Sequence, residues 1–194
     1  MAILGPLLRA QRNRDEASAW NRPNLRGPES ISLTSSTFID GGPIPQVHSG
    51  KRAGGANLSP ELAWNALPVA ARGLLLVVED LDVPAPKPFV HCLAWIDSSE
   101  LDEANHVPEG GLSGSETATG VTVFRSTAAL GYYGPEPLKG HGPHRYAFQL
   151  FGFTEATLTS PEGASLLQEK PRDVLDRVAL SVVARGRLTG TYER

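Results

Sequence analysis

The sequence GLLLVVEDLDVPAPKPFVHCLAWI, residues 73–96, contains two apolar segments joined by a proline-rich turn. The first segment, residues 74–78, is an unbroken apolar run, which is typical of a strand buried on both faces. Three acids, Glu79, Asp80 and Asp82, follow at the point where this strand should end, and the second segment carries one histidine, His91. Two strands that bring acids and a histidine to a rigid loop predict a functional site.

The composition is that of an ordinary globular protein, and it excludes several classes. The 194 residues suit a single domain with a sizeable core. The net charge of −3 argues against a nucleic-acid-binding protein, whose surface would be basic. A single cysteine, Cys92, excludes an intrachain disulfide and zinc sites that need two cysteines. No apolar run is long enough to span a bilayer, and the N-terminus lacks a signal-peptide layout, so we expect a cytoplasmic protein.

Residues 1–28 differ from the rest of the chain and are expected to form an N-terminal extension, part of it helical. Four apolar residues stand there at helical spacing: Ile3, Leu4, Leu7 and Leu8. We expect this helix to pack on its own domain or on a partner subunit. Peripheral contact with a membrane surface is the less favoured alternative, because Asp15 and Glu16 interrupt the basic face.

Residues 29–194 are predicted to form one mainly β domain. Short segments that alternate apolar and polar residues indicate strands, and residues 144–153 (HRYAFQLFGF) are the clearest of them. The best helical pattern covers residues 171–184, with Pro171 at its start and Gly186 just beyond its end. Several strands and one helix, without βαβ alternation, predict a β-sandwich with a few accessory helices.

A second glycine- and proline-rich segment precedes that clear strand, GYYGPEPLKGHGPHRY at residues 131–146. Because residues i and i+2 of a strand share a face, Asp80 and Asp82 could reach one pocket, and so could His144 and Tyr146. The same alternation within residues 89–96 places His91 and Cys92 on opposite faces. A pocket built from both segments is therefore predicted.

The residue types in this pocket suit anion binding. A buried carboxylate beside an imidazole favours the charged imidazolium, which can donate a hydrogen bond to an anion. Glycines in residues 131–146 would leave backbone N–H groups uncovered as further donors. The structural alternative is that Asp80 and His91 only satisfy each other at a strand end.

Other chemistries are less well supported by the sequence. Two histidines and a carboxylate match a metal-binding facial triad, but the histidine spacing of common metal motifs is missing. Residues 46–57, with Lys51 and Arg52 among glycines, are not followed by the GK[ST] of a nucleotide-binding loop. No G-x-S-x-G of a serine hydrolase occurs.

Three motifs together resemble the phosphatidylethanolamine-binding protein (PEBP) family, in particular its bacterial branch, which is often called Raf kinase inhibitor-like. They are D-x-D-x-P at residues 80–84 followed by His91, G-P-x-P-x-K-G…H-R-Y at residues 134–146, and LSPELAW at residues 58–64. The resemblance covers the chain from Ser30 to its C-terminus. Phe89 stands where many members carry Trp, and Leu81 replaces the usual Pro.

The resemblance implies a PEBP-like β-sandwich with a small pocket for phosphate-like and carboxylate anions, and a homodimer. We expect no cofactor and no metal. The ligand-binding positions that it implies are Asp80, Asp82, Pro84, Phe89, His91, Gly134, Pro135, His144 and Tyr146. We therefore expect a non-catalytic binding protein with a regulatory or inhibitory role. The alternative is a metal-assisted hydrolase or an acid–base enzyme that uses Asp80 and His91.

Overall fold

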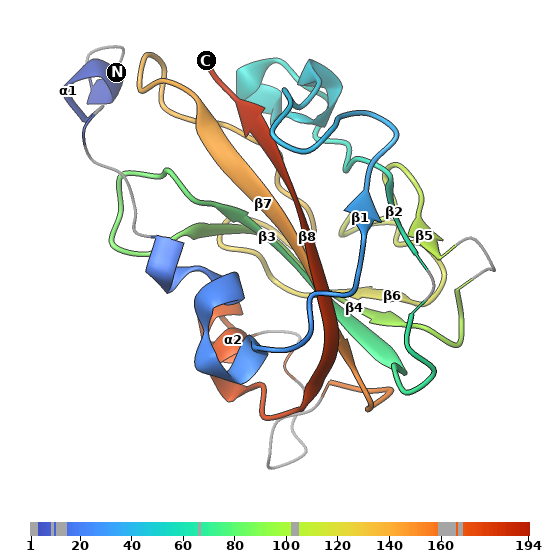
Figure 1. Cartoon of the computed structure of the whole chain (residues 1–194). Helices are drawn as coiled ribbons and strands as arrows, with labels where there is room; N and C mark the ends of the chain where they lie inside the picture. The colour runs from blue at the N-terminus through green and yellow to red at the C-terminus, as the bar shows by residue number, and fades with distance from the viewer. Residues whose placement is uncertain are drawn as a thin grey trace.

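The fold consists of two antiparallel β-sheets with few helices, which confirms the mainly β prediction (Figure 1). The computed structural model describes residues 4–8, 10, 15–65, 67–101, 105–158, 166 and 169–194. Within these residues, no helix is both long and apolar enough to cross a membrane.

The larger sheet has five strands in the order β6-β4-β3-β7-β8. Their bounds are Gly73–Asp80 for β3, Phe89–Asp97 for β4, Val121–Val123 for β6, His144–Phe153 for β7 and Val182–Tyr192 for β8. The central strand β3 is buried along its whole length, as its unbroken apolar run predicts. Because β3 is hydrogen-bonded to β4 and β7, its last residue, Asp80, lies beside Phe89, the first residue of β4, and beside Tyr146, the third residue of β7.

The smaller sheet has three short strands in the order β1-β2-β5. These are β1 (Leu33–Thr34), β2 (Leu62–Trp64) and β5 (His106–Val107). The α-helices are α1 (Leu4–Leu8) and α2 (Pro171–Arg177). The described residues also form five single 3₁₀ turns: η1 (Asp15–Ala17), η2 (Ala19–Asn21), η3 (Pro23–Leu25), η4 (Gln46–His48) and η5 (Lys51–Ala53).

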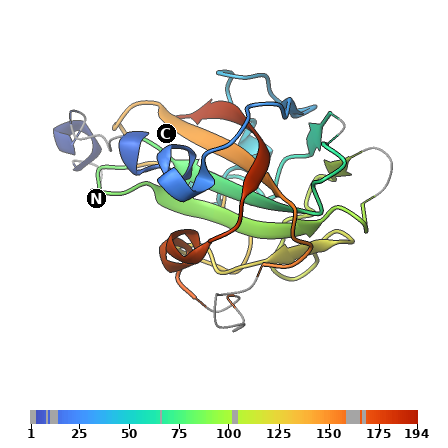
Figure 2. The ribbon, with the colours of Figure 1, turned by 60° about the horizontal axis from the view of Figure 1, so that its bottom comes forward.

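Two apolar clusters cover the two faces of the larger sheet. One fills the space between the sheets, where Leu76 and Phe148 meet Trp64 of the smaller sheet. The other lies on the opposite face, under α2 and the turns η2 and η3, and includes Trp20. Figure 2 shows α2, in red, on one side of the sheet formed by β7, β3 and β4. The segment before β1 thus helps to cover the core of the domain.

The helix predicted at residues 171–184 is wrong beyond Arg177. α2 ends there, and β8 begins at Val182 and continues through Gly186. Pro171 does stand in the first turn, as predicted. The apolar periodicity of the sequence extends beyond the end of the helix because Val178, which follows α2, is buried although it is not helical. Gly186 is a strand residue at which another part of the backbone comes close. A Cβ at this position would lie 2.1 Å from the carbonyl oxygen of Ile31, so only glycine leaves room for it.

Candidate functional site

A cavity of about 430 Å³ opens where β3 ends and where β4 and β7 begin. Both segments that the sequence singled out contribute to it, together with η5. The lining residues are Arg52, Asp80, Val83, Pro84, Phe89, His91, Ala128, Tyr133, Glu136, Pro137, Leu138 and His144. The lining combines apolar walls with a few charged or titratable groups, as is usual for small-molecule sites.

A β-bulge directs His91 into this cavity. The pairing of β3 with β4 passes from Val78–Cys92 to Glu79–Val90, so His91 is an extra residue in the ladder. Strict alternation would have placed His91 on the same face of the sheet as Leu93. Instead, Val90 and Leu93 share the apolar cluster on one face, and His91 points to the other face. The predicted opposition of His91 and Cys92 is therefore wrong at this point. Without the bulge, His91 would lie on the face away from Asp80.

Asp80 forms the floor of the cavity and is almost fully buried. Its Oδ1 accepts a hydrogen bond of 2.9 Å from the backbone N–H of Asp82. Its Oδ2 lies 2.7 Å from Nδ1 of His144. The carboxylate thus pairs with His144, and not with His91 as in the structural alternative drawn from the sequence.

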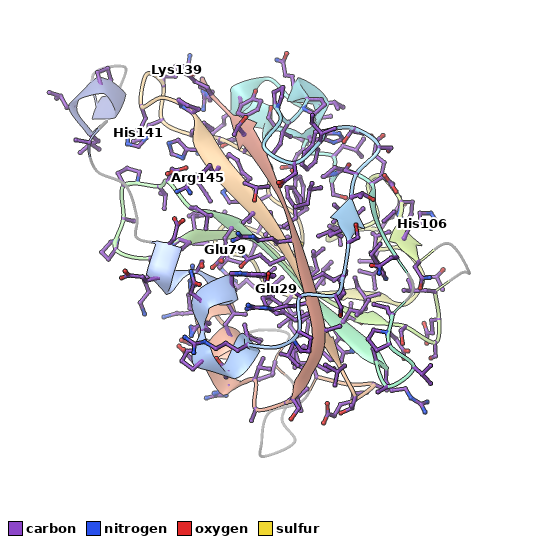
Figure 3. The ribbon with its side chains drawn as sticks, in the orientation of Figure 1. Glu29, Glu79, His106, Lys139, His141 and Arg145 are labelled. Atoms are coloured by element: carbon purple, nitrogen blue, oxygen red, sulfur yellow. The ribbon has the colours of Figure 1, made fainter. Side chains whose placement is uncertain are left out.

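The second nitrogen of His144 is also engaged. Its Nε2 lies 2.6 Å from Nδ1 of His141, and Nε2 of His141 lies 2.8 Å from the carbonyl oxygen of Leu8 in α1. A hydrogen-bonded chain therefore connects the floor of the cavity to the N-terminal helix. Figure 3 labels His141 in the loop between α1 and the start of β7.

His91 is held by a different partner, the backbone of Tyr133. The ring Nδ1 lies 2.6 Å from the carbonyl oxygen of Tyr133, and the backbone N–H of Tyr133 donates to the His91 carbonyl at 2.8 Å. A carbonyl oxygen can only accept, so Nδ1 carries the proton and Nε2 is the lone-pair nitrogen of the neutral ring. Burial lowers the pKa of His91 below 6.5, although the nearby Asp80 carboxylate and the Tyr133 carbonyl oppose this shift.

One wall of the cavity carries an acidic and a basic residue that were not predicted from the sequence. The Glu136 carboxylate accepts hydrogen bonds from the Arg52 backbone N–H, at 2.7 Å, and from the Tyr133 hydroxyl group. The basic residue Arg52 lines the same cavity. Residues 46–57 carry no nucleotide-loop motif, and the position of Arg52 depends on tertiary contacts of this segment with Glu136, which the sequence does not show.

The structure brings together five of the nine sequence-predicted positions in the cavity lining: Asp80, Pro84, Phe89, His91 and His144. The others do not line it. Asp82 instead accepts hydrogen bonds from the backbone and side chain of Arg145. Tyr146 lies beneath His91, with a ring-centroid distance of 5.1 Å, and burial raises its pKa.

Gly134 and Pro135 are turned away from the cavity because their backbones bind the segment around η4 and η5. The N–H of Gly134 donates to the Asn57 side chain at 2.7 Å, and the carbonyl of Pro135 accepts from the Gly50 N–H. Gly131 and Gly140 also donate their N–H groups to carbonyl oxygens. The expectation of uncovered glycine amides is thus wrong at these three glycines, whose loop is fixed by its own hydrogen bonds.

The described part of the chain contains no group of three or more His, Cys, Asp or Glu side chains arranged to hold a metal ion. Both nitrogens of His144 already have hydrogen-bond partners, and one nitrogen of His91 is bound to a carbonyl oxygen. The donor set that the facial-triad alternative requires is therefore not assembled.

The family model described as phosphatidylethanolamine-binding protein matches residues 34–193 of this chain, which include every residue that lines the cavity. The chain belongs to the phosphatidylethanolamine-binding protein family. This confirms the resemblance seen in the motifs around Asp80, His91 and His144.

Bacterial relatives in this PEBP family support the assignment. A UPF0098 protein of Aquifex aeolicus is 30% identical over 172 residues, which are 87% of this chain and 91% of that protein. The UPF0098 protein Rv1910c of Mycobacterium tuberculosis is 32% identical over 180 residues, or 92% of this chain and 79% of that protein. The crystal structure of E. coli YbcL, described as a new member of the mammalian PEBP family, has the same fold, with a TM-score of 0.72 at 22% identity. That comparison covers 84% of this chain and 98% of YbcL.

Proposed function

We propose that this PEBP-family protein binds a small oxyanion, such as a phosphomonoester, phosphate or a carboxylate, in the cavity at the end of β3, without catalysis. The observation that carries the proposal is that Arg52 and His91 line one cavity together with several apolar residues. A guanidinium matches the geometry of phosphate and carboxylate oxygens, and imidazole is a hydrogen-bonding group of adjustable charge.

The size and composition of the cavity support a small ligand. Its volume of about 430 Å³ lies within the range of about 300–1,000 Å³ that is usual for small-molecule sites. Phe89, Pro84, Pro137 and Leu138 offer apolar surface to an organic group carried by the oxyanion. The name of the family, which refers to a phosphate ester, is consistent with this class of ligand.

Calorimetric titration with methyl phosphate tests the proposal. We expect His91→Ala and Arg52→Gln to weaken binding by roughly 10- to 100-fold, because each removes a hydrogen bond to a charged group worth about 1.5–3 kcal/mol. Lys51→Gln is the matched control, since it removes the same charge one residue away, outside the cavity lining. Equal affinity of the wild type, His91→Ala and Arg52→Gln would overturn the proposal.

Binding is favoured over hydrolysis by the chemistry of the lining. This holds for hydrolysis through a serine, threonine or cysteine nucleophile, since the described residues that line the cavity include none of these three types. The homodimer, the cytoplasmic location and the regulatory role stay predictions from the sequence.

A further inference from the structure

The floor of the cavity already holds all the protons that its hydrogen bonds require. Three bonds connect Asp80, His144, His141 and the Leu8 carbonyl in sequence. Each bond needs one proton, and the carbonyl end can only accept, so the chain contains three protons. Two neutral imidazoles supply two of them, and the third balances the carboxylate. The floor is therefore electrically neutral, and His144 has no N–H left for a ligand.

The facing wall is also neutral overall, because it contains the Glu136 carboxylate and the Arg52 guanidinium. Both oxygens of Glu136 accept hydrogen bonds from within the wall, so its charge is fixed in place. An oxyanion that enters the cavity thus finds a neutral floor, one cationic residue, Arg52, and one carboxylate without a balancing proton, Glu136. One guanidinium does not compensate both Glu136 and an incoming anion.

His91 is the remaining polar group of the lining that can change its charge toward the ligand. Its Nδ1 donates to Tyr133, so Nε2 offers a lone pair and no proton. The titratable or charged groups around it are Asp80 on β3, His144 and Tyr146 on β7, Tyr133 and Glu136 in the loop before β7, and Arg52 on η5. A deprotonated oxygen facing this lone pair would be repelled, whereas a single proton between them would form a hydrogen bond.

We infer that the cavity binds an oxyanion together with one proton, which lies between a ligand oxygen and Nε2 of His91. The inference rests on the proposed oxyanion-binding function and specifies the ligand class: oxyacids that bring a proton, such as the monoanion of a phosphomonoester, are bound directly. A phosphomonoester dianion, or an anion without an acidic proton, takes one proton from solution when it binds. The His91 ring does not supply that proton itself, because burial lowers its pKa and favours the neutral ring in the free protein.

The inference predicts how affinity depends on pH. A phosphomonoester loses its second proton with a pKa of about 6, so well above that pH each unit increase should weaken the binding of methyl phosphate about tenfold. Well below that pH the ligand carries the proton itself, and its affinity should level off. Methyl sulfate, which has no proton to bring, should continue to gain affinity as the pH falls, until His91 is protonated in the free protein.

Calorimetry in two buffers of different ionisation enthalpy measures the protons taken up. For the wild-type protein at about pH 8, we expect close to one proton per methyl phosphate or methyl sulfate bound. At about pH 5, uptake should fall toward zero for methyl phosphate and stay higher for methyl sulfate. In His91→Asn, the proton uptake that accompanies binding of either ligand should disappear, because the nitrogen that shares the proton is missing. His106→Gln, on β5 of the other sheet, should keep the wild-type proton uptake.

The two proposals fail in different ways. Binding of both ligands with no proton uptake and with affinity independent of pH would overturn the inference and leave oxyanion binding intact. No binding of either ligand at any pH from about 5 to 8 would overturn the proposed function itself, and the inference with it. The wild-type measurement decides between these outcomes even if His91→Asn does not fold.

Discussion

Glu79 and Asp80 are neighbours in sequence, are both buried at the end of β3, and point to opposite faces of the sheet. Glu79 is enclosed by fixed partners: the Ala19 N–H at 2.8 Å, the Gln149 amide at 2.8 Å and the Arg172 guanidinium at 2.7 Å. Asp80 instead lies at the floor of a cavity and binds His144. Two adjacent carboxylates thus have different roles.

The difference lies in where the partners of each acid lead. Those of Glu79 belong to β7, α2 and the turn η2, so this acid fastens three parts of the fold to one strand. Those of Asp80 lead through two histidines to α1 on one side and to an open cavity on the other. Burial and pairing alone do not identify a functional acid; access to a ligand does.

Glu79→Gln should have the largest effect on stability, because it leaves the Arg172 guanidinium buried without its countercharge. We expect a loss of about 3 kcal/mol in the free energy of unfolding in urea, at the lower end for a broken buried pair because Arg172 is slightly exposed. The double variant Glu79→Gln/Arg172→Met should recover part of this loss. Equal stability of Glu79→Gln and the wild type would remove the distinction between the two acids.

Asp80→Asn should cost less stability, about 2 kcal/mol, because it removes a charged hydrogen-bond partner while the amide oxygen still accepts one bond. The floor loses both a carboxylate and its balancing proton, so it stays neutral, and the affinity for methyl phosphate should change much less than in His91→Asn. Urea unfolding and calorimetry measure the two quantities. A loss of affinity as large as that of His91→Asn would show that the floor carries charge toward the ligand.

The pH dependence of stability should show the environment of His91. Its pKa in the folded state is below 6.5, so the unfolded chain binds the proton first as the pH falls. The contribution of His91 to stability is therefore complete above pH 6.5 and is lost as the pH falls through the folded-state pKa. The slope is at most about 1.4 kcal/mol per pH unit. Urea unfolding of His91→Asn at the same pH values should lack this loss; an unchanged profile would contradict it.

Gly5→Ala should have the smallest effect. A Cβ at Gly5 would lie 1.9 Å from the carbonyl oxygen of Lys139, so α1 must move away from the loop that holds His141. We expect a loss of less than about 1 kcal/mol, because a single hydrogen bond is exchanged for water. The NMR signals of the His141 ring should shift in Gly5→Ala but not in Leu7→Ala, whose side chain is exposed on the same helix. Unchanged signals in both variants would refute the contact.

The strands that build the site were predictable from sequence, because an apolar run such as residues 74–78 has few alternatives to a buried strand. Asp80, His91 and His144 were found for the same reason, since each stands at a strand end beside a rigid loop. The direction in which the His91 side chain points was not predictable from the alternation of residues, because a bulge depends on the pairing of two strands. Arg52, His141 and Glu136 were missed because their roles arise from contacts between distant segments.

The most direct test of this account is the protonation of the His91 ring when methyl phosphate binds, followed by ¹⁵N NMR of labelled protein at about pH 7.5. The account predicts that Nδ1 is protonated before and after the titration, in keeping with its bond to Tyr133. It also predicts that the Nε2 signal moves from that of a lone-pair nitrogen toward that of a protonated or strongly hydrogen-bonded one as the ligand saturates the protein. An Nε2 signal that keeps its lone-pair value in the saturated complex would contradict it.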